Sequence, residues 1–142
     1  MAAGKESRSL VADLMSKKVV TLGRNDTLKT AEALLKQRHI RHLPVLDADG
    51  ELCGIVTQRD LFRGAVLRSL GYGSRAEDMM LSSLLVKDAM SEDPVTVAPS
   101  TPLADAARLM VERRIGALPV LDAGRLVGIL TEGDFVRLAI GK

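Results

Sequence analysis

The chain has 142 residues, of which 46% are hydrophobic and 27% charged, and this balance predicts a globular protein with its own core. The formal net charge is +2 with acidic and basic residues interleaved, so charge alone indicates neither nucleic-acid nor membrane binding. The N-terminus is polar and lacks the apolar core of a signal peptide, so export is not expected. No apolar stretch approaches the about 20 residues needed to span a bilayer, so membrane insertion is not expected either. The single cysteine, Cys53, lies in an apolar run, which predicts a buried small side chain in a reducing compartment; we expect a cytoplasmic protein.

The sequence repeats itself after 75 residues, the spacing from Leu43 to Leu118. The run Leu-Pro-Val-Leu-Asp-Ala that begins at each of these leucines is identical in the two copies. After a one-residue deletion, Gly-Ile-Val-Thr ending at Thr57 matches Gly-Ile-Leu-Thr ending at Thr131. This duplication predicts a first repeat over 10–70, a linker over 71–84 with a covering helix, and a second repeat over 85–142.

In chain order, each repeat predicts the same βαββα unit. A short strand leads into an amphipathic helix, a hairpin follows, and a second helix opens after it. The strands are predicted at Val19–Leu22 and Val95–Val97, the helices from Thr27 to about Gln37 and from Pro102 to about Arg113, with Thr101 as N-cap. The hairpin arms are predicted at Leu43–Leu46 and Leu52–Val56, and at Leu118–Leu121 and Leu126–Leu130. Because one repeat is too short to close a core, we expect an α/β fold in which two repeats pack sheet to sheet about a pseudo-twofold axis.

Thr-x-x-Asp stands at the start of the second helix in both repeats, as Thr57 with Asp60 and Thr131 with Asp134. One interpretation is a capping box, which needs no ligand. The other is a nucleotide site, because a helix N-terminus and a threonine hydroxyl suit a phosphate, and an aspartate can accept hydrogen bonds from both hydroxyls of a ribose. The residues alone leave both interpretations open.

With its twice-occurring Leu-Pro-Val-Leu-Asp and Gly-Ile-Val/Leu-Thr-x-x-Asp motifs, the chain from Val11 to Leu138 resembles a tandem pair of cystathionine β-synthase (CBS) domains, a Bateman module. The resemblance implies a regulatory module that binds AMP, ADP, ATP or S-adenosylmethionine in clefts between its repeats. It also implies a homodimer and a separate target protein that receives the signal. Energy sensing is a typical role of such modules.

The resemblance also implies which residues bind the ligand. Each cleft would join the Thr-x-x-Asp of one repeat to the first strand, and to the residues before Leu-Pro-Val, of the other. One cleft would use Thr131 and Asp134 with Ser16, Thr21, Ile40, Arg41 and His42. The other would use Thr57, Arg59 and Asp60 with Ser91, Thr96, Ile115, Gly116 and Ala117.

The two implied clefts differ in charge. Lys17 and Lys18 accompany the first, where Glu92 and Asp93 stand at the second, so more phosphates are expected in the first; a solvated turn is the alternative reading of the lysines. Aromatic residues are only 2% of the chain, so an adenine ring would lie between aliphatic side chains, and base stacking on single-stranded nucleic acid is not expected.

The sequence lacks the motifs of common catalytic sites. It has two histidines and no Gly-x-Ser-x-Gly, P-loop, Gly-x-Gly-x-x-Gly or spaced Cys/His set. We therefore expect no catalytic residues, no metal and no catalytic cofactor. The alternative to the nucleotide sensor is a structural interaction module, whose Thr-x-x-Asp units are only helix caps and which binds no nucleotide.

Overall fold

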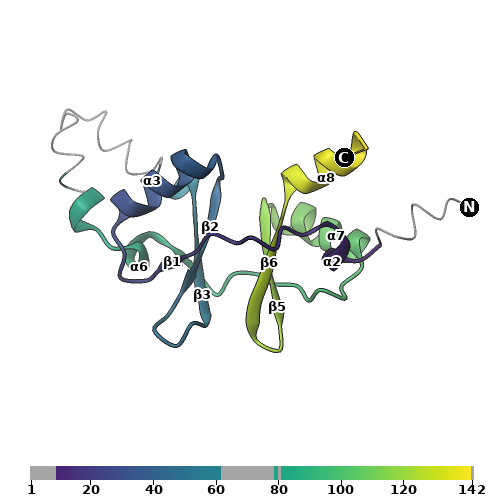
Figure 1. The fold of residues 1–142 in the computed structure, drawn as a ribbon, viewed down its shortest axis with the longest axis horizontal. Helices are drawn as coiled ribbons and strands as arrows, with labels where there is room; N and C mark the ends of the chain where they lie inside the picture. Colours follow the sequence, from purple (N-terminus) through teal and green to yellow (C-terminus); the bar gives the residue numbers. More distant parts are fainter. Residues whose placement is uncertain (1–8, 62–78, 80, 142) are drawn as a thin grey trace, which may run out of the picture. The chain divides into compact units, whose positions relative to one another are not determined.

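The structure, a computed structural model, describes residues 9–61, 79 and 81–141 (Figure 1). Two compact units form. One comprises the chain from Val20 to Pro94, and the other joins the chain up to Val19 with the chain from Val95 onward. Both units mix helices with strands, as the α/β prediction requires.

The unit from Val20 to Pro94 contains a four-stranded sheet in the order β1-β2-β3-β4. Strand β1 runs parallel to β2, and the pairs β2–β3 and β3–β4 are antiparallel. The strands are β1 (Leu22–Gly23), β2 (His42–Leu46), β3 (Leu52–Thr57) and β4 (Ser91–Glu92), and the helices are α3 (Leu28–Arg38) and α6 (Val86–Ala89).

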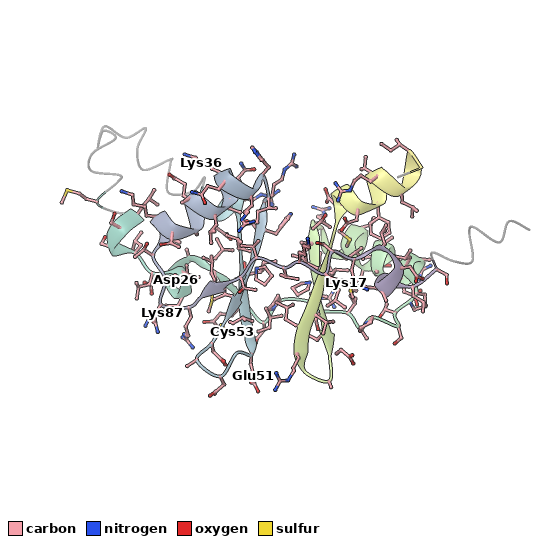
Figure 2. All side chains as sticks on the ribbon, in the orientation of Figure 1. Lys17, Asp26, Lys36, Glu51, Cys53 and Lys87 are labelled. Atoms are coloured by element: carbon pink, nitrogen blue, oxygen red, sulfur yellow. The ribbon has the colours of Figure 1, made fainter. Side chains whose placement is uncertain are left out.

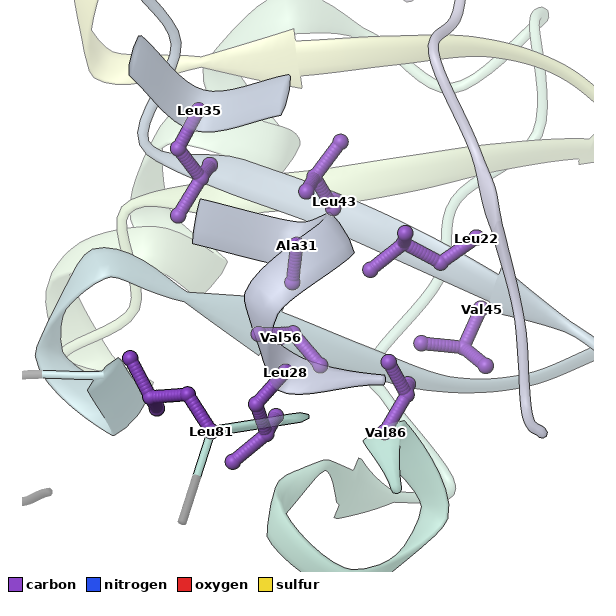
Figure 3. Packing of buried hydrophobic residues seen from close by; sticks show 9 residues of the cluster. All are labelled: Leu22, Leu28, Ala31, Leu35, Leu43, Val45, Val56, Leu81 and Val86. Carbon is purple, nitrogen blue, oxygen red and sulfur yellow. The ribbon is translucent and has the colours of Figure 1, made fainter. Parts of the chain in front are cut away.

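Helix α3 shows how the sequence positions this sheet. Its N-cap is Thr27, whose hydroxyl accepts a hydrogen bond from the Thr30 amide at 3.2 Å, and it ends at His39 in the left-handed conformation. Every third or fourth residue is apolar, so one face of the helix is buried against β2 and β3 (Figure 3). The buried residues of this core are Leu22, Leu28, Ala31, Leu35, Leu43, Val45, Val56, Leu81 and Val86.

The other unit repeats this arrangement with shorter pairings. Val97 forms a parallel bridge to Val120 on one side of the β5–β6 hairpin, and Ser16 forms an antiparallel bridge to Ile129 on its other side. These bridges occupy the places that β1 and β4 hold in the first sheet. The elements are α2 (Val11–Leu14), α7 (Leu103–Arg113), β5 (Ala117–Asp122), β6 (Arg125–Thr131) and α8 (Glu132–Ala139).

Each unit is completed by the first segment of the other repeat. Val11 is fully buried in the core that contains Leu118 and Leu130, and Val86 is fully buried in the core that contains Val45. Backbone bonds hold these segments in place, such as Val11 N–H to the Thr101 carbonyl at 2.8 Å and Val86 N–H to the Asp26 carbonyl at 2.7 Å. Figure 2 labels Asp26 and Lys87 on the two paired stretches of the first unit. The repeats and the compact units therefore divide the chain at different places.

The predicted helices and hairpins are present, with corrections at their ends. Both hairpins extend one residue or more beyond the predicted arms, and β1 begins at Leu22 instead of Val19. The predicted cap at Thr101 is wrong: Pro102 is the N-cap, and the Thr101 hydroxyl accepts from the Ala98 amide at 3.0 Å instead. The reason is that Pro102 has extended backbone (ψ 138°), so the helix cannot begin before Leu103.

Two predicted helices fall partly on the described residues. Residues 58–61 are helical after Thr57, and the rest of that predicted helix lies outside the described residues. Of the predicted covering helix, Met79 and residues 81–83 are helical, and Leu81 is buried in the first core.

Gly128 allows the α2 segment to lie against β6. A methyl group added there would lie 2.5 Å from Met15 Sδ and 3.0 Å from the Ser16 carbonyl oxygen. We expect Gly128→Ala to lower the free energy of unfolding by about 1–3 kcal/mol, because the backbone of the paired segment has to shift. Urea denaturation measures this. Gly23→Ala is the control, since its nearest neighbour would be Asp26 Oδ2 at 3.5 Å; equal effects for both variants would contradict the prediction.

Candidate functional site

The Thr-x-x-Asp of the first repeat forms a capping box. The Thr57 amide donates to Asp60 Oδ2 at 2.7 Å, the Thr57 hydroxyl donates to the same oxygen at 3.1 Å, and the Asp60 amide donates to the hydroxyl at 3.3 Å. Both side chains are half-buried. The capping box is therefore present in this repeat, and its bonds fix the carboxylate at the start of the helix.

The second Thr-x-x-Asp has the same cap and one additional partner. The Thr131 amide donates to Asp134 Oδ2 at 2.8 Å, and the Thr131 hydroxyl lies 3.3 Å from that oxygen. The other oxygen, Oδ1, accepts from Arg137 Nη2 at 2.6 Å. Asp134 is 7% exposed and is the one buried charged residue among those that the structure describes. A buried carboxylate that accepts from an amide, a hydroxyl and a guanidinium is a rigid acceptor.

Sequence reasoning did not single out Arg137. The signal was available, because an arginine three residues after an aspartate on a helix faces that aspartate. Its importance depends on the burial of Asp134, which the spacing alone does not show.

The structure places the residues before Leu-Pro-Val beside the Thr-x-x-Asp of their own repeat. His42 pairs with Thr57, and the Arg41 carbonyl accepts from the Gln58 amide at 2.8 Å. In the second repeat, Ala117 pairs with Thr131, and the Gly116 carbonyl accepts from the Glu132 amide at 3.1 Å. The hairpin thus brings these backbone groups to the start of the second helix in each unit.

Because the first segment of each repeat lies in the unit of the other repeat, the predicted residues are divided between the units as follows. Ser16, Thr96 and Ile115 are in the unit of Thr131 and Asp134. Thr21, Ile40 and Ser91 are in the unit of Thr57 and Asp60, together with the exposed Arg59. The grouping of residues into two sites that the resemblance implies stays a prediction.

The charges that distinguish the two predicted sites are also divided between the units. Lys17 and Lys18 are exposed on the unit of Asp134, and Figure 2 labels Lys17. Glu92 and Asp93 are exposed on the unit of Asp60. The two lysines and the two acidic residues therefore lie on different units.

Cys53, labelled in Figure 2, is half-buried near the start of β3, whereas Thr57 is the last residue of that strand. Burial raises the pKa of its thiol, and the nearby Asp47 and Glu92 raise it further, against a lowering by Arg24. A raised pKa leaves little thiolate near neutral pH, so this cysteine is a poor nucleophile.

Within residues 9–61, 79 and 81–141, no group of three or more His, Cys, Asp or Glu side chains is arranged to hold a metal ion. The same part of the chain contains no helix long and apolar enough to cross a membrane.

The CBS domain family model matches residues 11–66 and 86–141, so the chain belongs to the CBS domain family and carries a tandem pair. A CBS domain-containing protein of Dictyostelium discoideum is 39% identical over 132 residues, which are 92% of this chain and 91% of that protein. A homoserine O-acetyltransferase of Methanococcoides burtonii is 34% identical over 129 residues, which are 90% of this chain but only 24% of that protein.

Two solved structures with bound ligands are similar over almost the whole chain. The structure of CBSX2 in complex with AMP has 34% identity and a TM-score of 0.76, and covers 93% of this chain and 96% of that one. The CBS domain pair of protein MJ0100, in complex with 5′-methylthioadenosine and S-adenosyl-L-methionine, has 28% identity and a TM-score of 0.79, and covers 94% and 97%. Both relatives bind adenosyl compounds.

Proposed function

We propose that this CBS domain pair is a regulatory module that binds an adenosyl compound. Asp60 and Asp134 accept hydrogen bonds from the ribose hydroxyls, and the hydroxyls of Thr57 and Thr131 donate hydrogen bonds to the phosphate. The observation that carries the proposal is that two relatives, similar over more than nine-tenths of the chain, hold AMP or S-adenosylmethionine. The fixed carboxylates at two helix starts supply the matching chemistry.

The wider site is part of the same proposal. The additional ligand-binding residues are those that the resemblance implies: Ser16, Thr21, Ile40, Arg41, His42, Arg59, Ser91, Thr96, Ile115, Gly116 and Ala117. Binding, without a reaction, is the proposed activity, and a change in shape is passed to a target protein. A homodimer completes the proposal, and Val136 and Ile140, 62% and 66% exposed at the end of the chain, are apolar side chains suited to such a contact.

Thermal stability tests the proposal directly. A ligand that binds only the native state stabilises it by about 2.7 kcal/mol at about 100 times its Kd. For a chain of this size we expect a rise in Tm of several degrees with at least one of AMP, ADP, ATP and S-adenosylmethionine. GMP at the same concentration is the control for a general effect of phosphate.

The alternative, a structural module that binds no nucleotide, makes the opposite prediction. Its melting curves stay unchanged with all four compounds at millimolar concentration. That result would reject the sensor, because the capping boxes alone explain the Thr-x-x-Asp motifs.

A further inference from the structure

The carboxylate of Asp134 is almost fully used within its own helix. A carboxylate offers about four acceptor positions. Oδ2 takes the Thr131 amide and hydroxyl, and Oδ1 takes the Arg137 guanidinium. A ribose that donates both hydroxyls needs two positions, so one of these donors has to leave. A phosphate that accepts from the Thr131 hydroxyl releases that donor, whereas a ligand without a phosphate does not.

Arg137 is the charged donor that can leave most readily. Its side chain is 57% exposed, whereas that of Asp134 is only 10% exposed. The guanidinium reaches a buried acceptor from solvent and can return to solvent by rotation of its own side chain. The Thr131 amide, by contrast, is fixed by the backbone.

The Arg137 guanidinium lies close to the proposed phosphate position, as the surroundings of Gly133 show. A methyl group at residue 133 would lie 3.4 Å from Arg137 Nη1 and 3.6 Å from the Thr131 hydroxyl oxygen. The arginine and the threonine hydroxyl therefore converge at the first turn of α8. A guanidinium displaced from Asp134 would still lie within reach of an anion at this helix start.

We propose that Arg137 is a specificity-determining residue. It pairs with Asp134 when no ligand is bound, and it favours adenosyl ligands with an anionic 5′ group. This inference rests on the proposed function. A nucleotide takes the Thr131 hydroxyl onto its phosphate, which frees the second position on Asp134, and the phosphate also compensates the charge of Arg137. A neutral ligand such as 5′-methylthioadenosine leaves that hydroxyl in place, so it has to displace the arginine and leaves it without an anion, and it binds less tightly.

Calorimetric titration of AMP and of 5′-methylthioadenosine tests the inference. In the wild type we expect AMP to bind more tightly. In Arg137→Met, which keeps much of the apolar stem, we expect 5′-methylthioadenosine to bind severalfold more tightly and the preference for AMP to fall at least about tenfold. Arg137→Lys keeps the charge and should retain most of the preference.

Arg108→Met is the matched control. Arg108 and Asp105 form a pair with the same spacing on α7 of the same unit, at 3.0 Å, but both side chains are more than half exposed. Its loss should leave both affinities unchanged. A wild type that binds neither compound rejects the role of Arg137, and it rejects the proposed function as well if ADP, ATP and S-adenosylmethionine also leave the Tm unchanged. A wild type that binds them, with the same preference in Arg137→Met, rejects the role of Arg137 alone.

Discussion

Asp134→Asn is expected to lower the affinity for an adenosine nucleotide at least about tenfold while the protein stays folded. The change removes the negative charge, and each charge-assisted bond to a ribose hydroxyl contributes about 1.5–3 kcal/mol. The cost to stability is smaller. The loss of charge at the helix start is worth about 0.3–1 kcal/mol, and the exposed Arg137 regains water when its pair is broken.

A 2′-deoxynucleotide separates ribose binding from a merely structural role of Asp134. The deoxy ligand should bind the wild type weakly and should lose little further affinity in Asp134→Asn, because the missing hydroxyl and the missing charge belong to one contact. Asp105→Asn on α7 is the control, since it removes the carboxylate of an exposed pair with the same spacing. Losses that simply add across calorimetric titrations of both ligands and both proteins would show that Asp134 does not contact the ribose.

Val11→Asp is expected to destabilise the unit that contains most of the second repeat, although Val11 belongs to the first repeat. Val11 is fully buried among residues of that unit, including Leu118, so an aspartate there loses about 1.5–3 kcal/mol of apolar burial and adds the several kcal/mol of an unpaired charge. Hydrogen exchange measured peptide by peptide should become faster first over residues 103–139.

Val86→Asp is the reciprocal variant. Val86 is fully buried in the other core, beside Leu22 and Val45 (Figure 3), so exchange should become faster first over residues 22–57. If either aspartate variant fails to fold, Val→Thr at the same position keeps the shape and buries one hydroxyl, which costs about 1–3 kcal/mol. Faster exchange confined to the repeat to which each valine belongs would contradict the pairing of these segments with the other repeat.

Local chemistry made most of the elements predictable. Apolar residues at helical spacing identified α3 and α7, and apolar runs on either side of short turns identified both hairpins. The Ala123-Gly124 turn has positive φ at both residues, 52° and 80°, as a two-residue hairpin turn requires. The errors occurred where a neighbour decides the outcome, as at Thr101, whose hydroxyl closes a turn with Ala98 instead of capping α7.

The sequence by itself determined the duplication, the βαββα order, the positions of the two Thr-x-x-Asp motifs and the family, because each depends on residues close together in one repeat or on matching the repeats. Only the tertiary structure decided which segment completes which sheet, as when Ser16 pairs with Ile129. The tertiary structure alone also revealed that Arg137 forms an ion pair with the buried carboxylate of Asp134. The physical reason is that hydrophobic periodicity shows which face of an element is buried but not against which partner, and spacing shows which charges can meet but not whether water reaches them.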